Sequence, residues 1–148
     1  MSARPIAALI AAVTAVLLVP EVAQAAKWKG ETRQGRLVEV TTGSDGLVTR
    51  ARIRYRARCG DGKTLSSGVI FLAPLQAATA TGFRDGGVFR FKLGGGERAK
   101  ATTRIEGGLR RSGRWTGDFR VTVRVTRKSG RFVTNCRSGR IGWKASPV

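Results

Sequence analysis

The chain has 148 residues, two cysteines, no histidine and a formal net charge of +19. This length is typical of one domain, and a hydrophobic content of 41% is enough for a packed core despite the charge. The absence of histidine excludes histidine-dependent catalysis and histidine-ligated metal sites. Two cysteines are too few for a zinc site made of four thiolates.

Residues 1–25 are predicted to form a secretory signal peptide. Arg4 precedes an uncharged apolar run over residues 6–19, which Pro20 ends. Residues 23–25 (Ala-Gln-Ala) then match the small-x-small pattern of a cleavage site. The apolar run is shorter than the roughly 20 residues of a membrane span, although an N-terminal membrane anchor is the alternative.

Cleavage would leave residues 26–148 as a secreted or extracytoplasmic domain with no membrane span. The removed segment holds one basic and one acidic residue, so the charge of the mature chain stays at +19. Because exported proteins enter oxidising compartments, Cys59 and Cys136 are predicted to form a disulfide. Two free buried thiols are the alternative.

Period-2 alternation predicts strands, and the first long run spans residues 50–59. The residues on its apolar face are Ala51, Ile53, Tyr55, Ala57 and Cys59. The residues on its opposite face are Arg50, Arg52, Arg54, Arg56 and Arg58. A helix would spread these arginines around its circumference, so a strand is favoured.

Three further runs alternate in the same way. The outward-facing cations predicted for them are Arg90, Lys92, Lys100, Arg104, Arg120 and Arg124. The inward-facing residues include Phe89 and Phe91, Ala99 to Ile105 at alternate positions, and Trp115 to Val125 at alternate positions. Gly117 interrupts the last of these apolar faces and is predicted to mark a bend or a bulge.

Turn signals separate the runs. Three Asp-Gly pairs, at residues 45–46, 61–62 and 85–86, each predict a hairpin turn. Turns are also predicted at 94–96, 112–113 and 128–130, and a last short strand is predicted over 140–144, after Gly139. Residues 74–81 are ambiguous between an irregular crossover and a short helical turn.

The predicted fold is all-β: a single antiparallel β-sandwich or barrel of about 8–10 strands with one disulfide. Tyr55 and Trp115 are predicted to point inward. Trp28 and Trp143 lie near the ends of the mature chain, where they either join the core or stay exposed. Small inward residues such as Ala51 leave open an interior that admits a ligand.

The chain closes with Cys136-Arg137-Ser138-Gly139-Arg140-Ile141-Gly142-Trp143, and Arg54-Tyr55-Arg56-Ala57-Arg58-Cys59 precedes the Asp61-Gly62 turn. These stretches, above all the closing Cys-x-Ser-Gly-x-x-x-Trp pattern, resemble small secreted β-domains of high-GC actinobacteria. The resemblance implies export, a β fold and a cysteine pair. It implies no catalytic residues.

The acidic residues do not indicate an enzyme, a metal site or a cofactor. The three Asp-Gly aspartates are explained by their turns. Glu106 and Asp118 are expected to pair with Arg104 or Arg120 across a hairpin. A catalytic carboxylate pair would need Glu39 or Glu97 beside another acid. No loop holds the several acids that calcium requires.

The basic surface is the positive functional signal. Arginine forks suit phosphate and carboxylate groups, and aligned strands would form one broad cationic plate. The predicted anion-binding residues are Arg50, Arg52, Arg54, Arg56, Arg58, Arg120 and Arg124. We expect association with anionic polymers of the envelope, without specific nucleic-acid binding. The alternatives are a merely solvated face, and a module that binds a protein partner or a small apolar ligand. The oligomeric state is left open.

Overall fold

The computed structural model describes residues 25–148, so the predicted signal peptide lies outside the described residues but for its last position. The described residues form ten strands and contain no α-helix, which confirms the all-β prediction. The strands are β1 (Lys27–Thr32), β2 (Leu37–Thr42), β3 (Val48–Cys59), β4 (Thr64–Leu72), β5 (Ala77–Thr79), β6 (Gly82–Lys92), β7 (Arg98–Leu109), β8 (Trp115–Thr126), β9 (Phe132–Arg137) and β10 (Ile141–Pro147), with one 3-10 turn, η1 (Gly94–Gly96).

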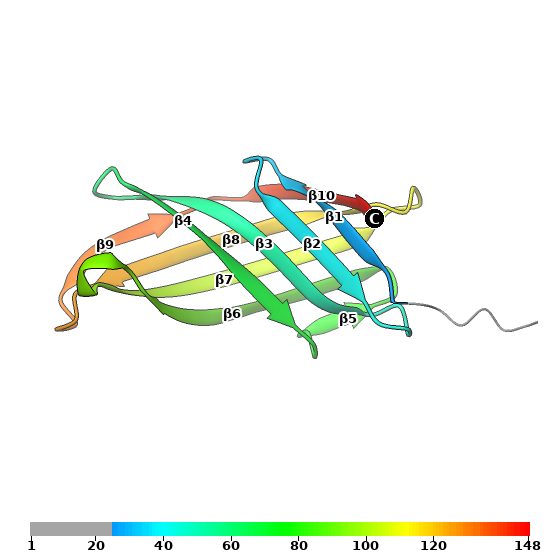
Figure 1. Ribbon diagram of the computed structural model, residues 1–148, viewed down its shortest axis with the longest axis horizontal. Helices are drawn as coiled ribbons and strands as arrows, with labels where there is room; N and C mark the ends of the chain where they lie inside the picture. The colour runs from blue at the N-terminus through cyan, green and yellow to red at the C-terminus, as the bar shows by residue number, and fades with distance from the viewer. Residues whose placement is uncertain (1–24) are drawn as a thin grey trace, which may run out of the picture.

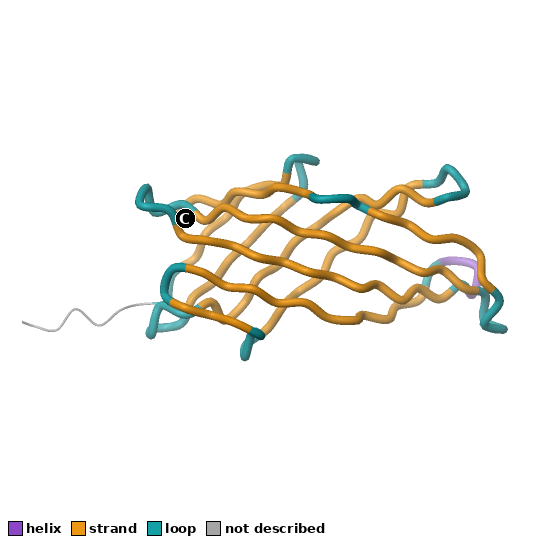
Figure 2. Tube along the Cα trace, turned by 180° about the vertical axis from the view of Figure 1, so that it is seen from behind, coloured by secondary structure: helices purple, strands orange, loops and turns teal. Residues whose placement is uncertain are grey.

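All strand pairings are antiparallel, and the sheet bends over into two layers (Figure 1). The strand order is β10-β1-β2-β3-β9-β8-β7-β6-β5, and β10 also pairs with β8. The strands β1, β2, β3, β9, β8 and β10 therefore form a hydrogen-bonded ring. Outside this ring, β4 extends one layer beyond β3, and β7, β6 and β5 extend the other, which faces the viewer in Figure 2.

The alternating apolar residues meet between the layers. Ile53, Trp115 and Phe119 are fully buried, and Tyr55 is 2% exposed and packs its ring against Phe119. Trp143 is also buried, at 4% exposed. Burial on this scale is the main stabilising contribution to a domain of this size.

Trp28 is half-buried, and its indole Nε1 donates to the Gly113 carbonyl at 2.9 Å. Its ring meets Trp115 edge-on, with centroids 6.1 Å apart. Both terminal tryptophans therefore contact the core.

Gly117 has a packing role and does not mark a bulge. It pairs with Gly107 on β7 and with Trp143 on β10, and the strand register is continuous there. A Cβ at Gly117 would lie 2.6 Å from Trp143 Cζ2. The shifts in register occur elsewhere, between residues 41 and 42 and between residues 125 and 126.

Two of the three predicted Asp-Gly turns are confirmed. Asp45 and Asp61 each accept a hydrogen bond from the backbone N–H two residues later, and the glycines that follow have positive φ. The prediction for Asp85-Gly86 is wrong, because both residues lie inside β6 and pair with β7 without interruption. A Cβ at Gly86 would lie 2.8 Å from the Thr103 carbonyl oxygen, so close strand approach explains this glycine.

The connection between β4 and β6 resolves the ambiguity over residues 74–81. It is an irregular crossover that contains the short strand β5, and it includes no helical turn.

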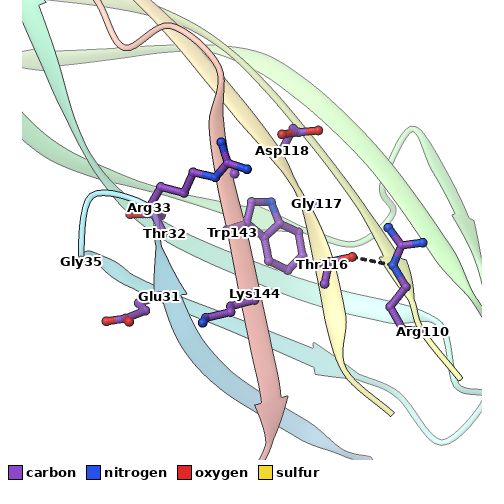
Figure 3. A pocket seen from close by; sticks show the side chains of 11 residues that line it. Glu31, Thr32, Arg33, Gly35, Arg110, Thr116, Gly117, Asp118, Trp143 and Lys144 are labelled. Atoms are coloured by element: carbon purple, nitrogen blue, oxygen red, sulfur yellow. Dashed lines mark hydrogen bonds between the residues drawn. The ribbon is translucent and has the colours of Figure 1, made fainter. Parts of the chain in front are cut away.

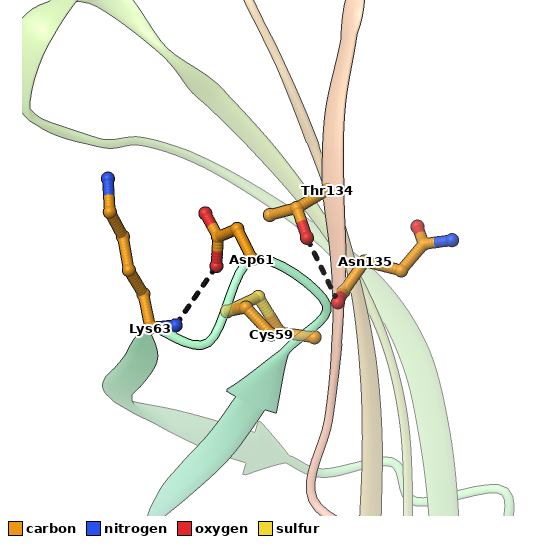
Figure 4. The surroundings of a disulfide bond; sticks show 6 residues. Cys59, Asp61, Lys63, Thr134 and Asn135 are labelled. Carbon is orange, nitrogen blue, oxygen red and sulfur yellow. Dashed lines mark hydrogen bonds between the residues drawn. A yellow bond between two sulfur atoms is a disulfide. The ribbon is translucent and has the colours of Figure 1, made fainter.

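The predicted disulfide is present between Cys59 and Cys136, which lie directly opposite each other on β3 and β9 (Figure 4). Only one further residue pair, Arg58 and Arg137, joins these two strands in register. The bond therefore holds the two layers together where their hydrogen-bonded pairing is shortest.

Candidate anion-binding surface

The strand β3 presents its arginines outward because its alternate residues are core residues. Ala51, Ile53, Tyr55 and Ala57 are buried. The exposed arginines of the same strand are Arg50, Arg54, Arg56 and Arg58. The fifth, Arg52, is half-buried and forms an ion pair with Glu39 on β2, with Nη1 and Oε2 3.3 Å apart.

The predicted single plate is not formed. The strands β3 and β8 belong to one sheet, but the sheet bends between them, so their outer faces belong to different layers (Figure 1). Only the end of β3 adjoins the second layer, where Arg58 lies opposite Arg137 on β9. The seven arginines predicted to bind anions therefore divide between separate surfaces.

A groove on the outer face of β6, β7 and β8 gathers the most concentrated positive charge. Its volume is about 660 Å³. The residues that line it are Arg90, Phe91, Lys92, Arg98, Ala99, Lys100, Arg124 and Thr126. Five of these eight are cations and none is a carboxylate. We call this site the cationic groove.

Strand register places the groove cations directly beside one another. Arg90 pairs with Lys100, and Lys100 pairs with Arg124, so three cations form one row across three strands. In the adjacent row Lys92 pairs with Arg98. Like charges directly opposite each other destabilise a sheet, so this arrangement has an electrostatic cost that a bound anion would relieve.

An aromatic ring fixes one of these cations. The Arg124 guanidinium lies over the Phe132 ring, with Cζ 5.2 Å from the ring centroid. Phe132 is itself 49% exposed, which is unusual for a phenylalanine. The contact restricts the Arg124 side chain and lowers the entropy lost when it binds a ligand.

The remainder of the β7–β8 face carries both signs of charge, because Arg104 and Arg120 form one row and Glu106 and Asp118 the next. Glu106 and Asp118 pair directly, and Arg140 donates a hydrogen bond to Asp118. That hydrogen bond lowers the pKa of the Asp118 carboxyl. Glu106 lies 4.0 Å from Arg104, which is on the same strand, and the partner of Asp118 is Arg140, on the link between β9 and β10. Neither acid therefore forms the ion pair across the hairpin that the sequence had predicted. Arg120 lines a pocket with these residues and so belongs to this mixed region.

A pocket of about 600 Å³ on the outer face of β1, β10 and β8 also contains both signs of charge (Figure 3). Three cations, Arg33, Arg110 and Lys144, share it with Glu31 and Asp118. Arg110 Nε donates to the Thr116 hydroxyl at 2.7 Å. Because its charges are nearly balanced, this pocket has less attraction for anions than the cationic groove has.

Of the residues predicted to bind anions, only Arg124 lines the cationic groove. The alternation of the sequence predicts that Arg90, Lys92 and Lys100 point outward, but it does not show that they lie beside one another. Arg98 was not among the predicted cations. The alternation predicted around Lys100 extends back to Arg98, so it could have identified Arg98 as a further outward-facing cation.

Residues 25–148 contain no cluster of three or more potential metal ligands among their cysteines and acids. They also contain no helix long and apolar enough to cross a membrane. No protein-family model and no curated protein matches the chain.

Proposed function

We propose that the protein is a non-enzymatic, exported domain that associates electrostatically with anionic polymers of the cell envelope or the extracellular matrix. The observation that carries this proposal is the cationic groove, with five cations and no carboxylate among its lining residues. Its row of three directly opposed cations would be stabilised by a ligand that carries several negative charges.

The rest of the molecule supports a polymeric ligand. A net charge of +19 on 148 residues creates a long-range attraction for polyanions that weakens as salt is added. The exposed arginines of β3 lie on a separate surface and would extend the contact to further repeats of a long polymer. The disulfide is consistent with export, because such bonds persist mainly in oxidising compartments.

The groove favours tetrahedral oxyanions. Three of its five cations are arginines, whose planar forks bind two oxygens of one phosphate or sulfate. The two lysines add point charges without this geometric preference. Phosphate- or sulfate-bearing polymers are therefore the class of ligand that the groove suits best.

The test compares two triple variants that each remove three positive charges. Arg98→Gln/Lys100→Gln/Arg124→Gln alters the groove, and Arg50→Gln/Arg54→Gln/Arg56→Gln alters the β3 row. Affinity for long-chain polyphosphate would be measured over a salt titration, with neutral dextran as the control ligand and circular dichroism as the check on folding. We expect the groove variant to bind about tenfold more weakly, or roughly 0.5 kcal/mol per cation, and the β3 variant to lose much less. Equal losses would mean that the groove is only part of a general positive background.

A further inference from the structure

The strand β4 has one free edge, and the backbone groups of its alternate residues point toward that edge. Among the strands of residues 25–148 it pairs only with β3. Ala73 N–H donates to the Thr49 carbonyl, and Cys59 N–H donates to the Lys63 carbonyl, so the odd-numbered residues between them direct their backbone toward β3. The even-numbered residues direct their N–H and C=O groups to the free edge, because backbone direction alternates along a strand. These residues are Ser66, Gly68, Ile70 and Leu72.

Within the part of the chain that the structure describes, this edge lacks the features that normally protect an edge strand from pairing with another chain, namely charges, proline, a bulge or a covering strand. Over its nine residues β4 contains no charged residue and no proline, and its register with β3 is continuous. The edge of β6 differs. It is covered by β5 over Gly82–Arg84, its Gly86 carbonyl accepts from Gln76 Nε2 at 2.9 Å, and it then carries Arg90 and Lys92.

Apolar surface adjoins the free edge on both faces of the sheet. On the outer face Ile70 is 40% exposed and Leu72 is 63% exposed. On the inner face Phe71 meets Phe89 of β6, with ring centroids 5.9 Å apart, and Phe89 is only half-buried. An added strand would gain backbone hydrogen bonds from β4, and apolar side chains on its inner face would lie beside Phe89.

The positive charge beside the free edge of β4 indicates which kind of partner strand would bind there. Gly68 has no side chain, and the Arg54 side chain crosses it, with Cγ 3.3 Å from the position that a Cβ would take. Arg52 and Arg50 lie opposite Ile70 and Leu72. A second copy of this chain would bring the same arginines and a net charge of +19 to the contact. An acidic partner would be attracted there.

We propose that β4 is a strand-addition site for an extended segment of an acidic partner protein, in which apolar and acidic residues alternate. Main-chain hydrogen bonds to the even-numbered residues of β4 supply affinity, and the arginines of β3 select the acidic side chains. This proposal is independent of the cationic groove, which lies on β6 to β8 and uses no backbone pairing.

The probe is a synthetic peptide that alternates valine and glutamate, and its control is the same peptide N-methylated at alternate amides. Fluorescence anisotropy would measure binding to the mature protein. Ser66→Pro removes an N–H at the free edge without removing a ladder hydrogen bond, and Ser66→Ala is its matched control. We expect Ser66→Pro and peptide methylation each to weaken binding about tenfold or more, and Ser66→Ala to have little effect.

Two further variants keep the test decisive if Ser66→Pro fails to fold. Ile70→Glu places a negative charge on the edge that repels the acidic peptide and should also abolish binding, whereas Arg114→Gln, on a distant hairpin, should not alter it. The groove triple variant should bind the peptide normally. Equal binding of the methylated peptide, or undiminished binding by Ile70→Glu, would overturn the proposal. A dimer that forms without peptide and is abolished by Ser66→Pro would identify a second copy as the occupant and would also overturn it.

Discussion

The side-chain amide of Gln34 hydrogen-bonds both backbone polar groups of Arg56. Arg56 N–H donates to Gln34 Oε1 at 2.8 Å, and Gln34 Nε2 donates to the Arg56 carbonyl at 3.1 Å. The strand β2 pairs with β3 as far as Ile53, and β9 pairs with β3 from Arg58 onward. Gln34 therefore bonds the Arg56 backbone in place of a neighbouring strand, in the stretch of β3 between its pairings with β2 and β9.

Replacing Gln34 with alanine should lower the free energy of unfolding by about 1–2 kcal/mol, because two hydrogen bonds are lost. Hydrogen exchange of the Arg56 amide should accelerate more than that of its neighbours. Gln76→Ala, which removes one side-chain hydrogen bond on another part of the sheet, serves as the control. Unchanged exchange at Arg56 in Gln34→Ala would contradict this role.

Gly117→Ala should destabilise the fold by at least about 3 kcal/mol, because no space exists for a methyl group. A Cβ there would lie 1.9 Å from the Glu106 carbonyl oxygen and 2.6 Å from the Trp143 ring. Gly94→Ala is the matched control, because a Cβ at Gly94 meets nothing within 4 Å. Chemical denaturation of both variants would measure the difference, and similar midpoints would argue against close packing at Gly117.

Loss of the disulfide in Cys59→Ser/Cys136→Ser should cost about 4 kcal/mol in the chain-entropy model. The bond closes a loop with a sequence separation of 77 residues. Denaturant titration of the variant and of the oxidised protein would give the difference. A stability loss under about 1 kcal/mol would contradict this expectation.

Stability should fall at alkaline pH because of Tyr55. Burial raises the pKa of its phenol above 10.0, and a hydrogen bond with the Ser67 side chain offsets this in part. The unfolded chain releases the phenolic proton at a lower pH than the folded chain does. The contribution of the neutral Tyr55 phenol to folding stability is therefore complete below the ordinary pKa of tyrosine. It is lost as the pH rises through the pKa that Tyr55 has in the folded protein.

The check is to compare unfolding free energies of Tyr55→Phe and the parent protein across this alkaline range. The parent protein should lose stability more steeply, because the variant has no phenol to ionise. Tyr55 is the only tyrosine in the chain, so tyrosinate absorbance reports its titration directly. The raised pKa of Tyr55 would be refuted if the parent protein and Tyr55→Phe lost stability equally with pH and if Tyr55 titrated at the ordinary pKa of tyrosine.

Local patterns predicted much of this fold. Alternation in residues 50–59 identified both faces of β3, and the predicted signal peptide led to the correct prediction of the Cys59–Cys136 bond. The Asp-Gly pattern failed at residues 85–86 because a turn and a close strand crossing both favour glycine. Only the pairing of Asp85 and Gly86 with Ile105 and Arg104 of β7 distinguishes these two explanations, and that pairing is not local.

The candidate site was less predictable because it depends on which strands adjoin. Alternation showed that Arg124 points outward, but its neighbours Lys100 and Arg90 follow from the register of three strands. The bend of the sheet between β3 and β8 likewise separates residues that share one pattern. The Arg140–Asp118 hydrogen bond joins the β9–β10 link to β8, with no local signal in the sequence.

The most direct test of the central claim is an NMR titration of residues 26–148 with inorganic tripolyphosphate at low salt. The groove should respond first, with the largest shifts at the Nε–H groups of Arg90, Arg98 and Arg124 and at the backbone amides near them. These shifts should reverse when salt is added. Larger shifts along Arg50 to Arg58, or shifts spread evenly over all exposed arginines, would contradict the assignment of anion binding to the cationic groove.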